Sequence, residues 1–243
     1  MTTSPACLDR TFFSLSRTFI PPVTLDREQL ALVIVDMQYL DASPDEGFGA
    51  AMEVIEPGSM DFFNQRLEDQ VVPSIARLVA GFRERQLPIV YVLVGSDYRD
   101  LRDLPRRHRE WIRTIERASG IEDILWSGNP AYRVREEFPP QPEDTIVKKT
   151  AFGAFTSSTL DETLRSMGIE QLVVTGIATN CCVSTTIRDA ADIGYSVVVV
   201  EECTGDYDRV THETAIKGLF FNFARIVMTV DEALAAIDAR ATV

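Results

Sequence analysis

Histidine is scarce in this chain: its 243 residues include only His108 and His212. Neither stands in a sequence pattern with a carboxylate that is typical of a Cys–His or Ser–His catalytic triad. His108 falls among Arg106, Arg107 and Arg109, so we expect it to be exposed, and we expect His212 on a helix surface. A histidine-based hydrolase therefore finds little support in the sequence.

Cysteine is scarce as well, and its spacing excludes several kinds of site. The four cysteines are Cys7, Cys181, Cys182 and Cys203, with no CxxC pair and no metal-ligand spacing among them. Adjacent cysteines form a disulfide only with strained geometry. We therefore expect reduced thiols, no metal site and no cofactor, as in a cytoplasmic protein.

Basic residues and long apolar runs are also few. Lys and Arg number 24 against 37 Asp and Glu, a formal charge of −13, which disfavours nucleic acid and anionic membrane surfaces as partners. No apolar run has the length of a signal peptide or of a helix that spans a bilayer. Hydrophobic residues still make up 45% of the chain, enough for a globular core. We expect a cytoplasmic protein with neither nucleic acid nor a membrane as partner; the charge balance does not identify a substrate.

Short β-branched runs alternate with amphipathic stretches along the chain. The runs are nearly continuous and apolar, which is typical of strands buried on both faces of a parallel sheet. They fall at residues 31–35, 88–94, 145–147, 171–175, 196–200 and 225–229. The alternation predicts βαβ units and an α/β fold: a three-layer α/β/α sandwich around a mostly parallel, roughly six-stranded Rossmann-like sheet.

Two regions interrupt this alternation. Residues 1–30 predict an irregular N-terminal arm, and residues 31–243 predict a single domain. Within that domain, residues 96–140 are rich in charge, proline and tryptophan and predict an insertion with one helix near residues 107–118. An insertion of this length is often a lid or a subunit contact.

The most informative segment is TGIATNCCVSTTIRDA, residues 175–190. It predicts a strand end, a tight turn with two adjacent cysteines, and then a helix. A thiol at a helix start lies near free backbone amides and the positive end of the helix dipole, so we expect its thiolate form to be stabilised. Because the thiolate is the nucleophile, this segment indicates covalent catalysis by cysteine.

Further polar residues close two other predicted strands. Asp36 follows the run ALVIV, and Lys148 and Lys149 follow TIV. Ligands bind at the carboxyl ends of the strands in open parallel sheets. We therefore expect a carboxylate, an ammonium group and a thiol to meet at this edge of the sheet.

The sequence around these residues resembles a known family. DMQ at residues 36–38, KTAFGAF at 149–155 and GIATNCCVSTTIRDA at 176–190 are similar to the three signature motifs of the isochorismatase-like cysteine hydrolases. The resemblance runs from about residue 31 to residue 236, apart from the divergent 96–140 segment. The last motif is most similar to that of ureidoacrylate amidohydrolases, with biuret and triuret hydrolases close by.

The resemblance implies a catalytic triad of Asp36, Lys149 and Cys182. The spacing of the family motifs selects Cys182 over Cys181 and Lys149 over Lys148. Cys181 stands at a position that is usually apolar, and we expect it to be a small buried apolar residue without a catalytic role.

The resemblance also implies an oxyanion hole formed by the backbone amides of Ala178 and Cys182, and a cis peptide bond between Ile177 and Ala178. The Asp-x-His-x-His metal motif of the nicotinamidase branch is absent, since residues 95–100 read GSDYRD, so no metal is implied. Members of the family are usually dimers or tetramers, and a homo-oligomer is implied here.

Five residues are candidates for substrate binding. Phe152 and Phe155 follow the lysine and could wall a small flat pocket or simply pack in the core. Gln38 and Asn180 stand beside predicted catalytic positions and could bond substrate amides or satisfy backbone groups. Asn222 is a polar residue in an apolar run and could face the site.

Together these residues predict a cysteine-dependent amidohydrolase. It would cleave the C–N bond of a small linear amide, a carbamoyl or ureido compound, through a thioester with release of ammonia or an amine. Vinyl-ether-cleaving members of the family lack the cysteine, so Cys182 argues against isochorismate as substrate. Two alternatives stay open: a thiol redox sensor that uses Cys181 and Cys182, and an isochorismatase-like hydrolase that does not cleave amides.

Overall fold

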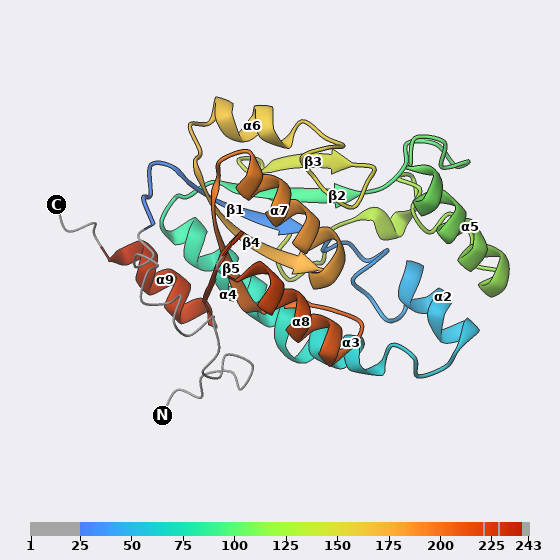
Figure 1. Cartoon of the computed structure of the whole chain (residues 1–243). Coiled ribbons are helices and arrows are strands. Elements are labelled where there is room, and N and C mark those ends of the chain that lie inside the picture. Colours follow the sequence, from blue (N-terminus) through green and yellow to red (C-terminus); the bar gives the residue numbers. More distant parts are fainter. Residues whose placement is uncertain (1–24, 221, 228, 240–243) are drawn as a thin grey trace.

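The computed structural model describes residues 25–220, 222–227 and 229–239, which form three layers with a parallel sheet in the middle (Figure 1). The strands are β1 (Leu30–Val35), β2 (Ile89–Val94), β3 (Thr145–Lys149), β4 (Gln171–Ile177), β5 (Ser196–Gly205) and β6 (Arg225–Val227). Each predicted strand is present, although β5 is longer than predicted and β6 shorter. The predicted α/β sandwich with a six-stranded Rossmann-like sheet is therefore confirmed.

The strands lie in the order β3-β2-β1-β4-β5-β6. The chain order reverses between β1 and β4, which pair from Leu30 opposite Gln171 to Val35 opposite Gly176. In open α/β sheets a ligand-binding crevice forms outside the carboxyl ends of the strands at such a reversal. The segments that follow β1 and β4 are therefore the ones placed to form a site.

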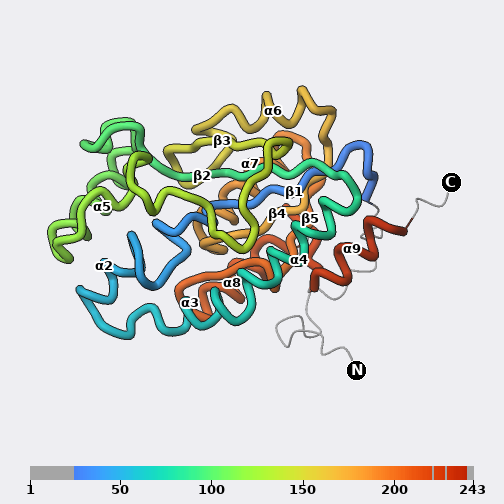
Figure 2. Tube along the Cα trace, turned by 180° about the vertical axis from the view of Figure 1, so that it is seen from behind, coloured from blue at the N-terminus to red at the C-terminus, as the bar shows by residue number. Residues whose placement is uncertain are grey.

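Two groups of helices cover the two faces of the sheet (Figure 1 and Figure 2). One face carries α3 (Asp61–Arg66), α4 (Val72–Glu84) and α9 (Val230–Asp238), and the other carries α6 (Leu160–Ser166), α7 (Ser184–Asp192) and α8 (Arg209–Leu219). Successive residues of β1 point to opposite cores: Leu32 and Ile34 join the first, and Val33 and Val35 join the second. This two-sided burial is why the strand sequences are continuously apolar.

Two more helices lie beyond the carboxyl ends of the strands. These are α2 (Gly47–Ile55) and α5 (Arg106–Ser119), at the right of Figure 1 and at the left of Figure 2. They contact each other, and the ring centroids of Phe48 and Trp111 lie 5.4 Å apart. Helix α5 matches the helix predicted near residues 107–118. The 96–140 segment thus stands beside the crevice.

Both histidines are buried, contrary to the prediction from the sequence. His108 is 4% exposed and His212 is 3% exposed. His108 shares the inner face of α5 with Ile112 and Ile115, so this face turns inward despite the flanking arginines. His212 likewise lies on the buried face of α8, one turn before Ile216.

The predicted N-terminal arm of residues 1–30 lies largely outside the described residues, which begin at residue 25. Cys7 lies outside them as well. Within the described part of the chain, no helix has the length and apolar composition needed to cross a membrane.

Candidate active site

Three polar side chains from separate strands meet at the carboxyl edge of the sheet. Asp36 is the first residue after β1, Lys149 is the last residue of β3, and Cys182 lies in the turn after β4. The Nζ atom of Lys149 lies 2.8 Å from Asp36 Oδ2 and 3.3 Å from Cys182 Sγ. Asp36 and Lys149 are fully buried, and Cys182 is 7% exposed. The structure therefore brings together the three residues that the sequence predicts as a triad.

The ammonium group of Lys149 is also held by the backbone that follows β3. Since β2 separates β3 from β1, a long side chain is needed to reach Asp36 from β3. The Lys149 Nζ atom donates hydrogen bonds to the carbonyl oxygens of Ala151 at 2.9 Å and Phe152 at 3.0 Å. These acceptors satisfy a buried charge that would otherwise be costly.

The backbone bends sharply where it leaves β4. The peptide bond between Ile177 and Ala178 is cis, at the position that the family resemblance implies. Gly176 has φ +110°, and a Cβ atom there would lie 2.0 Å from the carbonyl oxygen of Val35. Glycine is the residue that tolerates both this backbone conformation and this close approach.

The turn that carries Cys182 is tied to β5 and α8 by hydrogen bonds. Thr179 Oγ1 lies 2.9 Å from His212 Nδ1. The N–H of Asn180 donates to the carboxylate of Asp206, a residue that is itself buried at the end of β5. The turn is therefore fixed in place rather than free to move as an isolated loop.

Burial and the ion pair determine which groups hold protons. Burial raises the pKa of Asp36, and Lys149 opposes this shift. Burial disfavours the charged form of Lys149, but Asp36 and Cys182 outweigh that cost and raise its pKa, so the amine stays protonated. The hydrogen bond with Cys181, burial and Asp36 raise the pKa of Cys182. The resting sulfur is therefore a thiol beside a carboxylate of raised basicity.

This result corrects the prediction that the helix start stabilises the Cys182 thiolate. The sulfur does lie just before α7, but it is buried and faces the negative charge of Asp36. The hydrogen bond with Cys181, desolvation and the like charge of Asp36 all disfavour a thiolate, and Lys149 opposes them without reversing the shift. In the resting site, the thiol needs a base to become a nucleophile.

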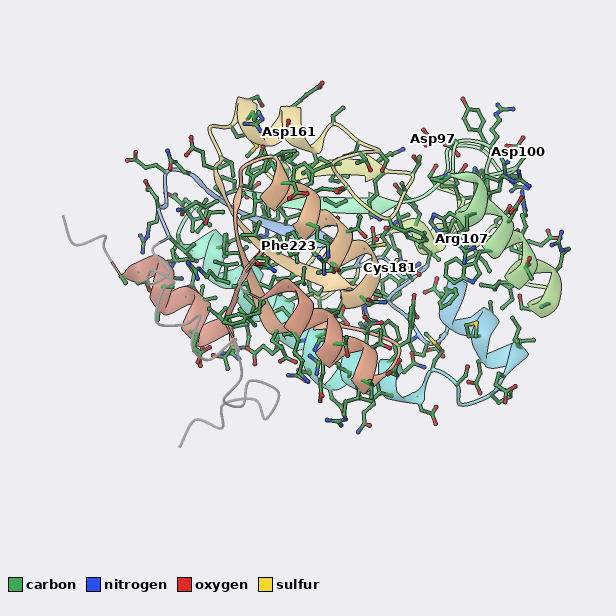
Figure 3. All side chains as sticks on the ribbon, viewed as in Figure 1. Asp97, Asp100, Arg107, Asp161, Cys181 and Phe223 are labelled. Atoms are coloured by element: carbon green, nitrogen blue, oxygen red, sulfur yellow. The ribbon has the colours of Figure 1, made fainter. Side chains whose placement is uncertain are left out.

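A cavity of about 570 Å³ opens beside the sulfur of Cys182. Its lining residues are Asp41, Val94, Arg107, His108, Glu110, Trp111, Ile112, Thr114, Leu125, Phe152, Ala178, Asn180, Cys181, Cys182 and Tyr207. Figure 3 shows two of them, Arg107 from α5 and Cys181 from the turn after β4, at the same end of the sheet. Asp36 and Lys149 do not line the cavity, so a ligand in it meets the sulfur first.

Three predicted site residues line this cavity together with Cys182. The ring of Phe152 lies against that of His108, with centroids 4.5 Å apart. Ala178 and Asn180 belong to the turn after β4, and Asn180 is exposed. All three residues are therefore placed where a ligand in the cavity could contact them. The oxyanion hole at Ala178 and the substrate contacts of Phe152 and Asn180 stay predictions.

Gln38 and Phe155 do not line the cavity, and we correct their assignment as substrate-binding residues. Gln38 is fully buried, and its side chain bonds the backbone of Val94 and Tyr132. The ring of Phe155 packs against Tyr195, with centroids 5.5 Å apart. In both cases the structural alternative left open by the sequence is the one observed.

Asn222 is also remote from the cavity, and this assignment is corrected as well. It is exposed in the turn that precedes β6, which places it at the amino ends of the strands. Its chain neighbour Phe223 lies to the left of Cys181 and farther from α5 in Figure 3. The polar residue in an apolar run reflects a turn rather than a site.

Cys181 is half-buried: it packs against both hydrophobic cores, as an apolar residue would, but it also lines the cavity, so the expectation of a buried apolar residue holds only in part. Its pKa is lowered, chiefly by the hydrogen bond with Cys182. Both adjacent thiols therefore face the same cavity, although only Cys182 lies beside Lys149.

Several lining residues were not identified from the sequence: Asp41, His108, Trp111 and Tyr207. Asp41 had a usable signal, because it is a charged residue in the segment that leaves β1 after Asp36. The other three come from α5 and from the connection between β5 and α8. Within the described ranges, no group of three or more His, Cys, Asp or Glu side chains is arranged to hold a metal ion.

Comparison with known proteins agrees with these motifs. The model of the isochorismatase domain family matches residues 31–232. The chain is 32% identical over 217 residues to the ureidoacrylate amidohydrolase RutB of Variovorax paradoxus (strain S110), an alignment that covers 87% of this chain and 82% of that protein. The chain belongs to the isochorismatase family, as its sequence motifs predicted.

Solved structures share the fold. A cysteine hydrolase from Pseudomonas syringae pv. phaseolicola 1448A matches with a TM-score of 0.73 and 23% identity, over 90% of this chain and 96% of its own. The N-carbamoylsarcosine amidase from Thermoplasma acidophilum matches with a TM-score of 0.60 and 24% identity, over 84% and 97%. At these identities the likeness is evidence for the fold alone.

Proposed function

We propose that this protein is a cysteine-dependent amidohydrolase that cleaves the C–N bond of a small linear amide, a carbamoyl or ureido compound. The observation that carries the proposal is the buried cluster of Asp36, Lys149 and Cys182, whose sulfur faces a cavity of small-molecule size. The similarity to a ureidoacrylate amidohydrolase adds support for an amide substrate.

The first step joins proton transfer to nucleophilic attack. The Cys182 thiol gives its proton to the Asp36 carboxylate while the sulfur attacks the substrate carbonyl carbon. The raised pKa of Asp36 makes it a stronger base than an exposed carboxylate. The Lys149 ammonium group, 3.3 Å from the sulfur, stabilises the negative charge that develops there.

The carbonyl oxygen then carries a negative charge, which the backbone amides of Ala178 and Cys182 would stabilise. Collapse of the tetrahedral intermediate breaks the C–N bond, and Asp36 returns its proton to the departing nitrogen. Ammonia or an amine leaves, and the acyl group stays on the sulfur as a thioester. Water then loses a proton to Asp36 and attacks the thioester, the C–S bond breaks, and the thiolate takes the proton back.

Ammonia and amine release from a panel of ureas and carbamoyl compounds tests the proposal. We expect wild-type protein to hydrolyse at least one of them, and Cys182→Ala and Cys182→Ser to lower kcat by about 10³-fold or more. Cys203→Ala is the matched control, because Cys203 is a buried thiol that does not line the cavity. Full turnover by Cys182→Ser on every active amide would show that the mechanism is wrong.

A thiol redox sensor is a second candidate, favoured by the two adjacent free thiols that line one cavity. It gives no role to the buried Asp36–Lys149 pair. Mild oxidation followed by peptide mapping separates the two functions. A reversible disulfide between Cys181 and Cys182, with no amide turned over, would favour the sensor. Loss of amide turnover on alkylation of Cys182 alone would favour the hydrolase.

A further inference from the structure

Asp41 is a carboxylate that lines the cavity beside the predicted nucleophile, and the proposed mechanism does not use it. We infer that the Asp41 carboxylate sets the substrate preference, by selecting an amide that carries a positively charged nitrogen group beyond the scissile carbonyl. The inference rests on the proposed amidohydrolase function, because it concerns the chemical character of the substrate group that lies beyond the carbonyl attacked by Cys182.

Asp41 presents a free carboxylate to the cavity. It lines the same cavity as Cys182, and its side chain is half-buried. Over the residues described by the structure, no hydrogen bond or ion pair joins its carboxylate oxygens to another side chain. Burial and the nearby Asp36 raise its pKa to about 7, with Lys149 opposing the shift. A cationic ligand would supply the stabilisation that this carboxylate lacks.

The segment that carries Asp41 is fixed by hydrogen bonds on both sides of it. The N–H of Leu40 donates to the carbonyl oxygen of Ala131 at 2.8 Å. The Nη1 atom of Arg135 donates to the carbonyl oxygen of Ala42, also at 2.8 Å, and Arg135 is itself buried. Asp41 is therefore preorganised, and binding need not order a loop.

His108 lines the same cavity as Asp41. It is 4% exposed, and its Nδ1 atom has no hydrogen-bond partner in the described part of the chain. Burial, followed by Lys149, lowers its pKa to about 4, so the ring is neutral. The ring also bonds the backbone of Thr150. A neutral ring adds no positive charge to the cavity, so it does not oppose a cationic ligand.

The remaining charges around the cavity also favour a cation. Asp36 and Lys149 form an ion pair at 2.8 Å and so offset each other. Glu110 and Arg107 line the cavity from the exposed surface of α5, where Figure 3 shows Arg107. Exposed charges of opposite sign are screened by water and salt. Among the charged residues that line the cavity, Asp41 is therefore the one least exposed to solvent.

Binding of three ureas to the Cys182→Ala protein tests the inference without turnover. N-(2-aminoethyl)urea is positively charged, N-propylurea is neutral, and N-carbamoylglycine is negatively charged. At pH 8, where Asp41 is ionised, calorimetry is expected to show N-(2-aminoethyl)urea binding at least about tenfold tighter than N-propylurea, because a charge-assisted hydrogen bond contributes that much. N-carbamoylglycine is expected to bind most weakly.

Adding Asp41→Asn to that variant is expected to bring the affinities for the cationic and neutral ureas to within about twofold of each other. Glu110→Gln is the matched control and should keep the preference, since it removes a carboxylate from the outer edge of the same cavity. Circular dichroism verifies that each variant is folded. Tighter binding of N-carbamoylglycine, a preference that survives Asp41→Asn, or no binding of N-(2-aminoethyl)urea overturns the inference.

Turnover of the same ureas by wild-type protein separates this inference from the proposed function. Hydrolysis that favours the cationic urea supports both. Cation-selective binding with no hydrolysis of any amide supports the role of Asp41 and contradicts the amidohydrolase proposal. Hydrolysis with no preference for the cation contradicts the role of Asp41 and leaves the amidohydrolase proposal standing.

Discussion

The ammonium group of Lys149 lies 2.8 Å from the carboxylate of Asp36, and neither side chain reaches solvent. A pair buried this completely is favourable only while both members are present, because either one alone would be an isolated charge in the protein interior. In the proposed mechanism Asp36 is the base, and Lys149 supplies the positive charge next to the sulfur. Stability and the proposed chemistry therefore depend on one contact.

Lys149→Met is expected to lower the free energy of unfolding by about 3–5 kcal/mol, because it leaves Asp36 buried and unpaired. Ammonia release should fall to background. Urea denaturation and the ammonia assay measure the two effects. Lys148→Met is the matched control: its ion pair with Asp97 is at the surface, so we expect a change within about 0.5 kcal/mol and full activity. Equal effects of the two substitutions would rule out the assignment of Lys149.

Asp41 is expected to make stability depend on pH. Its folded pKa of about 7 exceeds the ordinary 3.8, so its contribution to stability is present below pH 3.8 and is lost as the pH rises through 7. Asp41→Asn removes this titration. The melting temperature of Asp41→Asn minus that of wild type should therefore be larger at pH 8.5 than at pH 5.

Asp45→Asn provides the control for that comparison, since Asp45 is an exposed carboxylate in the same loop. Its difference from wild type should be nearly the same at both pH values. An Asp41→Asn difference that is also independent of pH would show that Asp41 is as solvated as Asp45.

Gly176→Ala is expected to destabilise the protein by about 2–6 kcal/mol, from backbone strain together with overpacking. The added Cβ would lie 2.0 Å from the carbonyl oxygen of Val35, at a φ of +110°. Gly168→Ala is the control, because Gly168 also has a positive φ, +73°, but no atom within 4 Å of the added Cβ. It should cost only about 1–2 kcal/mol. Thermal melts compare the two, and a larger loss for Gly168→Ala would contradict the packing of β4 against β1.

The strands and the triad could be predicted from sequence because each rests on a local pattern. A strand covered on both faces must be apolar at every position, so β1 and β4 stand out as continuous runs. Asp36 and Lys149 then mark strand ends, and parallel strands carry such residues to one edge of the sheet. The cis peptide after Ile177 followed only from the family resemblance.

The rest of the cavity could not be predicted because it depends on how remote segments pack. His108 was expected to be exposed because arginines surround it, yet its spacing to Ile112 places it on the inner face of α5. The Gln38 side chain forms hydrogen bonds with the backbone of Val94 in β2. No sequence pattern indicates a side chain–backbone contact between segments this far apart in the chain. Asp41 lies in the loop between β1 and α2, and Tyr207 lies in the loop between β5 and α8. Tertiary contacts determine the conformation of both loops, so the sequence alone does not place these residues at the cavity.

Mass mapping of the acyl-enzyme tests the central claim most directly. Wild-type protein is mixed with a urea that it hydrolyses, quenched with acid before one turnover is complete, and digested for peptide mass analysis. We predict that the acyl group of the substrate is attached to Cys182, and that the adduct is absent from Cys182→Ala. An adduct on Cys181 alone, or turnover with no adduct and full activity in Cys182→Ser, would contradict the role of Cys182 as the nucleophile.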